Sequence, residues 1–232
     1  MKKLLLLHGA LGSSAQFEPL KKKLSNQFEL YSPEFSGHGG KPLPGEAFAI
    51  EMFAKDVVNY LDQNAISAID VFGYSMGGYV ALYVAKHFPG KINSIITLAT
   101  KFNWNKETAI NESKMLDATI FEKKIPVYAQ DLALRHGQEN WKKLVEKTAE
   151  LIAAMGINTA LTYDDLKSID IPVMVTVGDA DKMVSVAETL EAAQYLKNGA
   201  SHVFIAMQHP LERIDVDAVA ALTIEWINNQ AG

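Results

Sequence analysis

Six apolar runs of strand length recur along the chain, and longer amphipathic segments separate most of them. The runs are continuously apolar rather than alternating, which is typical of strands that are covered on both faces. Alternation of such strands with helices favours a parallel sheet with right-handed crossover connections. The predicted strands are Lys3–Leu7, Glu29–Ser32, Ala68–Phe72, Ser94–Ala99, Pro172–Val177 and His202–Ala206, and the predicted helices are Gln16–Ser25, Ile50–Asn64, Met76–His87, Ala187–Leu196 and Val216–Asn229.

One interval between two predicted strands breaks this alternation. About seventy residues with a mostly helical pattern lie between Ala99 and Pro172, and this is too long for a simple connection. We therefore expect residues 1–100 and 169–232 to form the core, and residues 101–168 to form an inserted helical cap. Its predicted helices are Asn111–Phe121, Tyr128–His136 and Trp141–Met155, with a short turn at Tyr163–Lys167.

Charge and cysteine usage limit the possible function. The chain carries a formal net charge of -5, so it lacks the basic surface that nucleic acid or an anionic membrane requires. It has no cysteine, which excludes disulfides, thiolate catalysis and zinc sites built from cysteine. We expect a small-molecule substrate, no metal or organic cofactor, no nucleic acid partner and no membrane partner, while a homodimer stays open.

The N-terminal residues resemble a signal peptide only briefly. The apolar run Leu4–Leu7 has four residues before His8 and no small-residue cleavage site follows it, so it is better explained as a buried strand. No apolar stretch approaches the ~20 residues of a membrane helix. These features predict a cytoplasmic protein.

The strongest chemical signal is the pentapeptide Gly73-Tyr74-Ser75-Met76-Gly77. It follows a predicted strand and opens a predicted helix, which is the structural context that a G-x-S-x-G nucleophile turn requires. A serine at such a turn has a strained backbone, and glycines on either side avoid collisions with neighbouring chain. We predict Ser75 as a nucleophile, although a purely structural glycine-rich turn is the alternative.

A serine hydroxyl needs a general base, and six histidines are candidates. His209 fits best because it follows the last predicted strand, at the carboxyl edge where sites in parallel sheets form. His8 is expected to brace its loop, and His136 is expected to be solvated or to line a pocket. His202 is expected to be a polar core or edge residue.

The acid that orients the base should lie on an earlier loop at the same edge. Asp181 and Asp179 both follow the predicted strand that ends at Val177, and we favour Asp181 because Asp179 is better suited to shape the turn. Acyl chemistry also needs hydrogen-bond donors for an oxyanion. The backbone N–H groups of Met76 and Ala10 are the predicted donors.

These motifs resemble the α/β-hydrolase superfamily over essentially the whole chain. The resemblance implies an α/β-hydrolase fold, here with a mostly parallel six-stranded sheet flanked by helices, a helical cap and the triad Ser75, Asp181 and His209. The matching landmarks are Leu6-Leu7-His8-Gly9 with Gly12-Ser13, Gly37-His38-Gly39, the pentapeptide extended to Gly78, Gly178 with Asp181 and Val184, and His209-Pro210.

The predicted activity is that of a serine hydrolase, carboxylesterase-like, cleaving an ester or thioester of a small to medium, largely apolar substrate through an acyl-enzyme. Alternatives with the same triad are a C–C bond hydrolase, a perhydrolase, and a ligand-binding or receptor protein with slow turnover. Further cap side chains that could line an apolar pocket include Met115, Phe121, Trp141, Met155 and Tyr163. The residues predicted to bind substrate are Leu11, Tyr74, Phe102, Trp104 and Tyr128.

Overall fold

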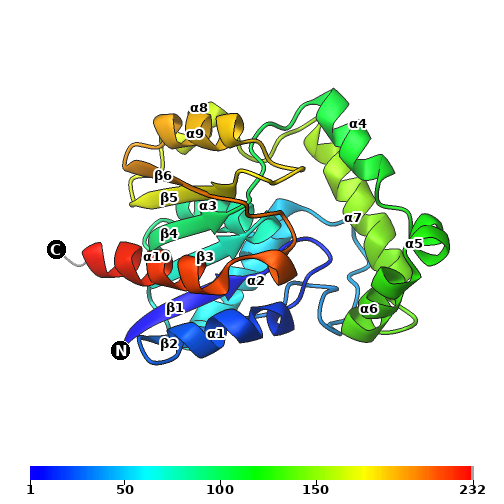
Figure 1. Ribbon diagram of the computed structural model, residues 1–232, viewed down its shortest axis with the longest axis horizontal. Coiled ribbons are helices and arrows are strands. Elements are labelled where there is room, and N and C mark those ends of the chain that lie inside the picture. Colours follow the sequence, from blue (N-terminus) through cyan, green and yellow to red (C-terminus); the bar gives the residue numbers. More distant parts are fainter. Residues whose placement is uncertain (231–232) are drawn as a thin grey trace.

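The computed structural model describes residues 1–230 of the chain. A six-stranded sheet lies at its centre in the order β2-β1-β3-β4-β5-β6, and every neighbouring pair is parallel, which confirms the predicted sheet (Figure 1). The strands are β1 (Lys2–Leu7), β2 (Phe28–Tyr31), β3 (Ile69–Tyr74), β4 (Ile92–Leu98), β5 (Val173–Gly178) and β6 (Gly199–Phe204).

Strand β6 differs most from its predicted position. It spans Gly199–Phe204 rather than His202–Ala206, so the prediction was wrong at both ends. β6 lies at the edge of the sheet, and Phe204 is its only buried residue. Because most of the strand is not buried, its first residues carry no apolar run from which a strand could be recognised.

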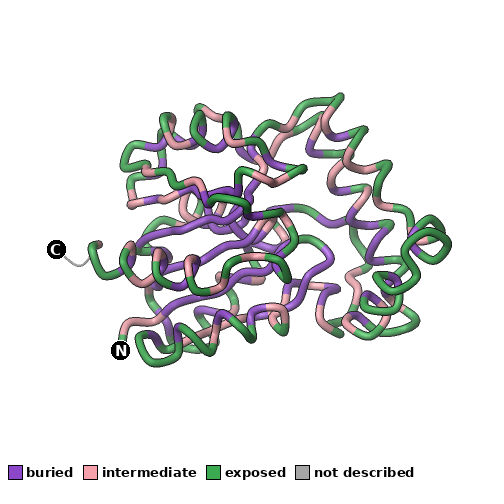
Figure 2. Tube along the Cα trace, viewed as in Figure 1, coloured by how far each residue is buried: buried purple, intermediate pink, exposed green. Residues whose placement is uncertain are grey.

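Helices cover both faces of the sheet. In Figure 2 the central strands are mostly buried, and the helices around them carry the exposed residues. On β1, Leu4 and Leu6 pack on the face covered by α1 and α10. Leu5 and Leu7 pack on the opposite face, with α2 and α3, and all four leucines are fully buried. Besides the strands and four helices between β4 and α8, the chain forms η1 (Ser14–Phe17), α1 (Glu18–Leu24), α2 (Ile50–Gln63), α3 (Met76–His87), α8 (Tyr163–Leu166), α9 (Val186–Tyr195), η2 (Leu211–Arg213) and α10 (Val216–Asn229).

A helical insertion, α4–α7, separates β4 from β5 and lies beside the sheet (Figure 1). The predicted helix Asn111–Phe121 is wrong, because residues 115–117 interrupt it. Asp117 begins a new helix there by accepting hydrogen bonds from the N–H groups of Thr119 and Ile120. The helices are α4 (Lys106–Lys114), α5 (Ala118–Lys124), α6 (Pro126–His136) and α7 (Trp141–Met155).

The limits of the cap at residues 101–168 stay a prediction. Helix α8 contacts α3 and α9 of the core, and the hydroxyl of Tyr79 in α3 donates to the carbonyl of Leu161 just before α8. Within residues 1–230, no helix combines the length and apolar character needed to cross a membrane. The cytoplasmic location also stays a prediction.

Candidate active site

Ser75 lies at the turn that joins β3 to α3, with a φ of 51° and a ψ of -118°. This backbone conformation is unusual for a residue with a side chain and needs support from its surroundings. The neighbouring backbone is also very close. A Cβ built on Gly77 would lie 2.1 Å from the carbonyl oxygen of Leu7, so only glycine fits at that position.

Two contacts with β4 and the loop after it, and a third within α3, hold the Ser75 backbone in place. The Ser75 N–H donates to the carbonyl of Leu98 at 2.8 Å, and the Thr100 hydroxyl donates to the carbonyl of Ser75 at 2.9 Å. The N–H of Gly78 donates to the same carbonyl at 3.1 Å. Sequence reasoning missed the role of Thr100, because a single threonine after a strand carries no distinctive spacing.

His209 and Asp181 are directly hydrogen-bonded, with 2.7 Å between His209 Nδ1 and Asp181 Oδ2. The other carboxylate oxygen of Asp181 accepts the N–H groups of Met183 at 2.7 Å and Val184 at 2.9 Å. Because both oxygens are held, the carboxylate orients the imidazole with Nδ1 toward itself.

The environment keeps the Asp181 carboxylate ionised. Burial of the side chain raises its pKa, but the hydrogen bonds from His209, Val184 and Met183 outweigh this effect and hold the pKa below its usual value. Asp179 is exposed, and its carboxylate accepts the N–H of Ala206 at 2.6 Å. Asp179 therefore fixes the turn after β6, while Asp181 contacts the histidine.

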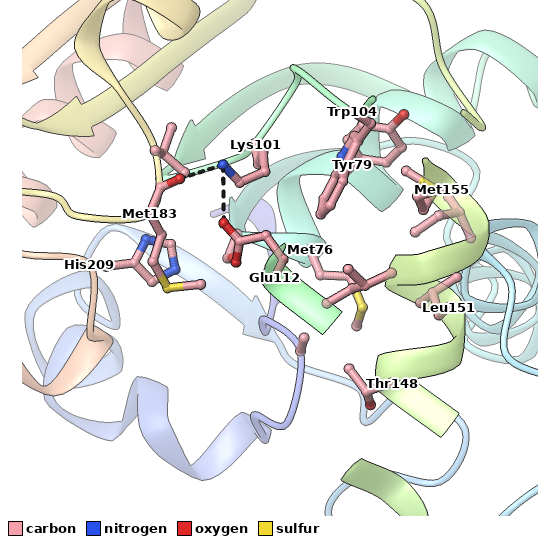
Figure 3. Close-up of a pocket in the computed structure, with 15 residues that line it drawn as sticks. Met76, Tyr79, Lys101, Trp104, Glu112, Thr148, Leu151, Met155, Met183 and His209 are labelled. Atoms are coloured by element: carbon pink, nitrogen blue, oxygen red, sulfur yellow. Dashed lines mark hydrogen bonds and ion pairs between the residues drawn. The ribbon is translucent and has the colours of Figure 1, made fainter. Parts of the chain in front are cut away.

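Ser75, His209, Met76 and Ala10 all line one cavity of about 100 Å³, so the structure brings the predicted nucleophile, base and oxyanion donors together (Figure 3). Helix α7 of the insertion supplies Leu151, Ile152 and Met155 to the opposite wall. The remaining lining residues are Ile50, Tyr79, Lys101, Trp104, Glu112, Thr148, Met183 and Val184.

The wall of this cavity includes one ion pair, between Lys101 after β4 and Glu112 of α4. Their closest charged atoms, Lys101 Nζ and Glu112 Oε1, are 3.4 Å apart, and the side chains are 15% and 13% exposed. Lys101 Nζ also donates to the carbonyl of Met183, in the loop that carries Asp181 (Figure 3). Sequence reasoning missed this pair, because its members lie on different elements.

Of the five residues predicted to bind substrate, Trp104 lies in the cavity lining with Ser75, and the other four do not. Leu11 and Phe102 are buried in the core cluster, and Tyr128 is exposed and packs against Phe121. Tyr74 is buried, and its hydroxyl donates to the carbonyl of His209 at 2.9 Å.

Tyr74 therefore positions the loop of the predicted base. Among the further cap candidates, Met155 lines the cavity and Met115, Phe121, Trp141 and Tyr163 do not.

His8 braces the loop after β1, as predicted. Its Nδ1 donates to the carbonyl of Gly9 at 2.8 Å, and its Nε2 accepts the N–H of Phe35 at 3.2 Å. His136 is fully buried, so the expectation of a solvated or pocket-lining side chain is wrong. His202 is exposed on the edge strand β6. Within residues 1–230, no group of three or more His, Asp or Glu side chains is placed to hold a metal ion.

Comparison with known proteins gives one family match. The family model described as the alpha/beta hydrolase fold matches residues 2–124, which is just over half of the chain. The pimeloyl-[acyl-carrier protein] methyl ester esterase of Neisseria meningitidis serogroup C is 33% identical over 100 residues, which are 43% of this chain and 37% of that protein. The chain spans between 6% and 37% of the length of the first curated relatives that it matches.

Solved structures match over the full length of the chain. NosK from Streptomyces actuosus has a TM-score of 0.86 at 16% identity, covering 100% of this chain and 99% of that one. A thermophilic esterase from Thermogutta terrifontis has a TM-score of 0.79 at 18% identity, covering 100% of this chain and 91% of that one. At such low identities these likenesses show the fold alone.

Proposed function

This chain belongs to the alpha/beta hydrolase fold family, and from that premise we propose that it is a serine hydrolase acting on a carboxylic ester or thioester. In this proposal Ser75 is the nucleophile, His209 the general base and Asp181 the acid that orients it. The N–H groups of Ala10 and Met76 are the donors for the oxyanion. The substrate is a small molecule, and neither a metal nor an organic cofactor takes part.

The first half of the reaction forms an acyl-enzyme. The oxygen of Ser75 attacks the substrate carbonyl carbon while its proton passes to Nε2 of His209. The carbonyl oxygen becomes negatively charged and accepts hydrogen bonds from Ala10 and Met76. Collapse of this intermediate breaks the bond to the alcohol or thiol, which leaves with the proton from His209.

The second half releases the acyl group. His209 takes a proton from water, the resulting hydroxide attacks the acyl carbon, and the same donors hold the second oxyanion. Ser75 leaves with the proton from His209, which regenerates the free enzyme. Throughout, the ionised Asp181 stabilises the positive charge that forms on the imidazole.

The observation that carries this proposal is the 2.7 Å hydrogen bond between His209 and Asp181, made beside a cavity that Ser75 also lines. The strained turn at Ser75 adds support, since such strain persists only where surrounding contacts maintain it. The name of the methyl ester esterase from Neisseria meningitidis, 33% identical over 100 residues, also supports ester chemistry.

The size of the cavity favours a short acyl group. An apolar cavity of about 150 Å³ holds one benzene molecule. The cavity beside Ser75 measures about 100 Å³, so it accommodates an acyl group of roughly four carbons or fewer. The apolar side chains of Leu151, Ile152 and Met155 suit an alkyl chain rather than a charged one.

The test is turnover of p-nitrophenyl esters from acetate to octanoate by the wild type, Ser75→Ala and Ser25→Ala. Ser25 is exposed at the end of α1 and serves as the matched control. We expect a maximum of kcat/KM at butyrate or shorter, a loss of at least about 10³-fold in Ser75→Ala, and no change in Ser25→Ala. Equal rates in the two variants would overturn the proposal.

The same triad could also serve a C–C bond hydrolase, a perhydrolase or a ligand-binding protein with slow turnover. The same assay separates the last of these, the ligand-binding protein, from the enzymes. A single burst of p-nitrophenol without continued release would favour the ligand-binding protein, because the acyl group would then stay on Ser75. Continued release at short chain lengths would favour the esterase.

A further inference from the structure

The carbonyl oxygen of Leu11 accepts two hydrogen bonds from the last turn of α6. Arg135 Nη1 donates at 3.0 Å and His136 Nε2 donates at 2.9 Å. Leu11 has a φ of 56°, a left-handed conformation that is unfavourable for a leucine. Because a carbonyl has two lone pairs, these donors satisfy it fully and hold the strained residue in place.

Leu11 belongs to the turn that carries the proposed oxyanion donor Ala10. The turn is closed by a hydrogen bond of 3.1 Å from the N–H of Gly12 to the carbonyl of Gly9. This turn packs against Ser75, since a Cβ built on Gly9 would be 3.2 Å from Cβ of Ser75. Rotation of the backbone at Leu11 would therefore change the direction of the Ala10 N–H next to the reacting carbonyl.

His136 is suited to hold Leu11 in one orientation. Its side chain is fully buried, and its Nδ1 accepts the N–H of Gly39 at 3.0 Å. Because Gly39 donates to Nδ1, the proton of the neutral ring lies on Nε2 and points to Leu11. Burial and the nearby charge of Arg135 outweigh the hydrogen bond to Leu11 and lower the pKa of His136 to about 4, which keeps the ring neutral.

Arg135 connects the same turn to the segment after the proposed base. Its Nη2 lies 3.5 Å from Oε1 of Glu212, in η2, three residues beyond His209. Glu212 also accepts a hydrogen bond of 2.6 Å from Gln16 in η1. Arg135 thus connects helix α6 of the insertion to the turn of Leu11 and to the segment after His209.

We propose that Arg135 and His136 are positioning residues that fix the Ala10 N–H in the orientation needed to stabilise the oxyanion. Helix α6 then contributes to catalysis through Leu11, whereas helix α7 lines the acyl pocket. The inference rests on the proposed serine hydrolase function. The two helices thus have different roles in the proposal. We therefore expect loss of the α6 contacts to lower kcat and to leave KM nearly unchanged.

The test compares Arg135→Met, Arg135→Lys and the control Lys142→Met, which removes a surface ion pair with Glu122 elsewhere in the insertion. With p-nitrophenyl butyrate we expect Arg135→Met to lower kcat about tenfold and to change KM less than twofold. Arg135→Lys should recover most of the loss, since it keeps a donor. Lys142→Met should match the wild type.

A second readout separates positioning from mere structural support. A short alkyl trifluoromethyl ketone adds to the nucleophile and forms an oxyanion, whereas the matching methyl ketone binds mostly as the uncharged carbonyl. Arg135→Met should weaken binding of the trifluoromethyl ketone by about the same tenfold and leave the methyl ketone unchanged. His136→Gln, which keeps a donor, should lose less activity than His136→Phe. If the Phe variant does not fold, the Arg135 series decides.

Active-site titration sets the concentration of each variant. The inference is overturned if Arg135→Met has the same kcat as Lys142→Met. It is also overturned if Arg135→Met changes only KM or the melting temperature. If the wild type itself neither turns over esters nor binds the trifluoromethyl ketone, the proposed function fails and this inference fails with it. A fully active wild type with an unaffected Arg135→Met overturns the inference alone.

Discussion

Lys101 and Glu112 form an ion pair in the wall of the cavity that Ser75 and His209 also line. Lys101 Nζ and Glu112 Oε1 are 3.4 Å apart. Lys101 also donates to the carbonyl of Met183, two residues beyond Asp181. One side chain therefore connects the loop after β4 to helix α4 and to the loop of the proposed catalytic acid.

Removing Lys101 should cost more stability than removing the whole ion pair. Lys101→Met leaves the Glu112 carboxylate unpaired among apolar side chains, and we expect the free energy of unfolding to fall by about 1–2 kcal/mol. Lys101→Met combined with Glu112→Gln should recover part of this loss. Urea unfolding measures both variants, with Lys142→Met at an exposed pair expected to change stability by less than about 1 kcal/mol. A double variant less stable than Lys101→Met would show that an unpaired Glu112 carboxylate is not the cause of the loss.

Asp181 and Asp179 should differ sharply in their effect on catalysis. In Asp181→Asn the remaining oxygen keeps the N–H groups of Met183 and Val184, so an NH2 donor replaces the acceptor that faces Nδ1 of His209; we expect kcat to fall by about 10³- to 10⁴-fold. Asp179→Asn keeps an oxygen that can accept the N–H of Ala206, so kcat should fall less than tenfold. Steady-state hydrolysis of p-nitrophenyl butyrate measures both. A larger loss in the Asp179 variant would show that Asp179, and not Asp181, is the acid that orients His209.

The lowered pKa of Asp181 predicts a loss of stability in acid. A carboxyl whose pKa is lower in the folded protein stabilises it above the unfolded-state pKa, near 4, and this contribution is lost as the pH falls toward the lower folded-state pKa. The free energy of unfolding should therefore decrease less between about pH 5 and pH 3 in Asp181→Asn than in the wild type. Denaturant titrations across this range measure the difference. Parallel pH curves would show that Asp181 does not contribute.

Met155 should limit the length of the acyl chain. It is 4% exposed and lines the cavity opposite Ser75, so Met155→Ala should enlarge the cavity and move the preferred p-nitrophenyl ester to a longer chain. The control is Leu134→Ala, which shortens an 86% exposed side chain elsewhere in the insertion. The ratio of kcat/KM for hexanoate to that for butyrate should rise in the first variant alone. An equal ratio in both would place the acyl group elsewhere.

Local patterns in the sequence predict the core of the fold well. Leu4–Leu7 indicates a buried strand because strands covered on both faces lack polar positions, and the structure buries all four residues. The turn at Ser75 has a local signature, since its glycines are required by close backbone contacts within a few residues and with β1. His209 and Asp181 follow from their places after strands at one edge of the sheet, and the structure brings them together.

Features that depend on contacts between distant segments could not be predicted in this way. Leu11 and Arg135 are 124 positions apart, and neither the arginine nor His136 has a local pattern that indicates a shared carbonyl. Lys101 and Glu112 are close in sequence, but one lies in a loop and the other on a helix, so no helical spacing indicates their ion pair. The break between α4 and α5 was missed because Asp117 continues a helical pattern in sequence, although its side chain caps a new helix.

Covalent labelling by a fluorophosphonate tests the proposal that Ser75 is an activated nucleophile. We expect one adduct per wild-type chain by intact-mass spectrometry, located on the peptide that contains Ser75. Ser25→Ala should form the same adduct, and Ser75→Ala should form none. A folded wild-type protein without an adduct, or an adduct on another residue, would show that Ser75 is not the nucleophile.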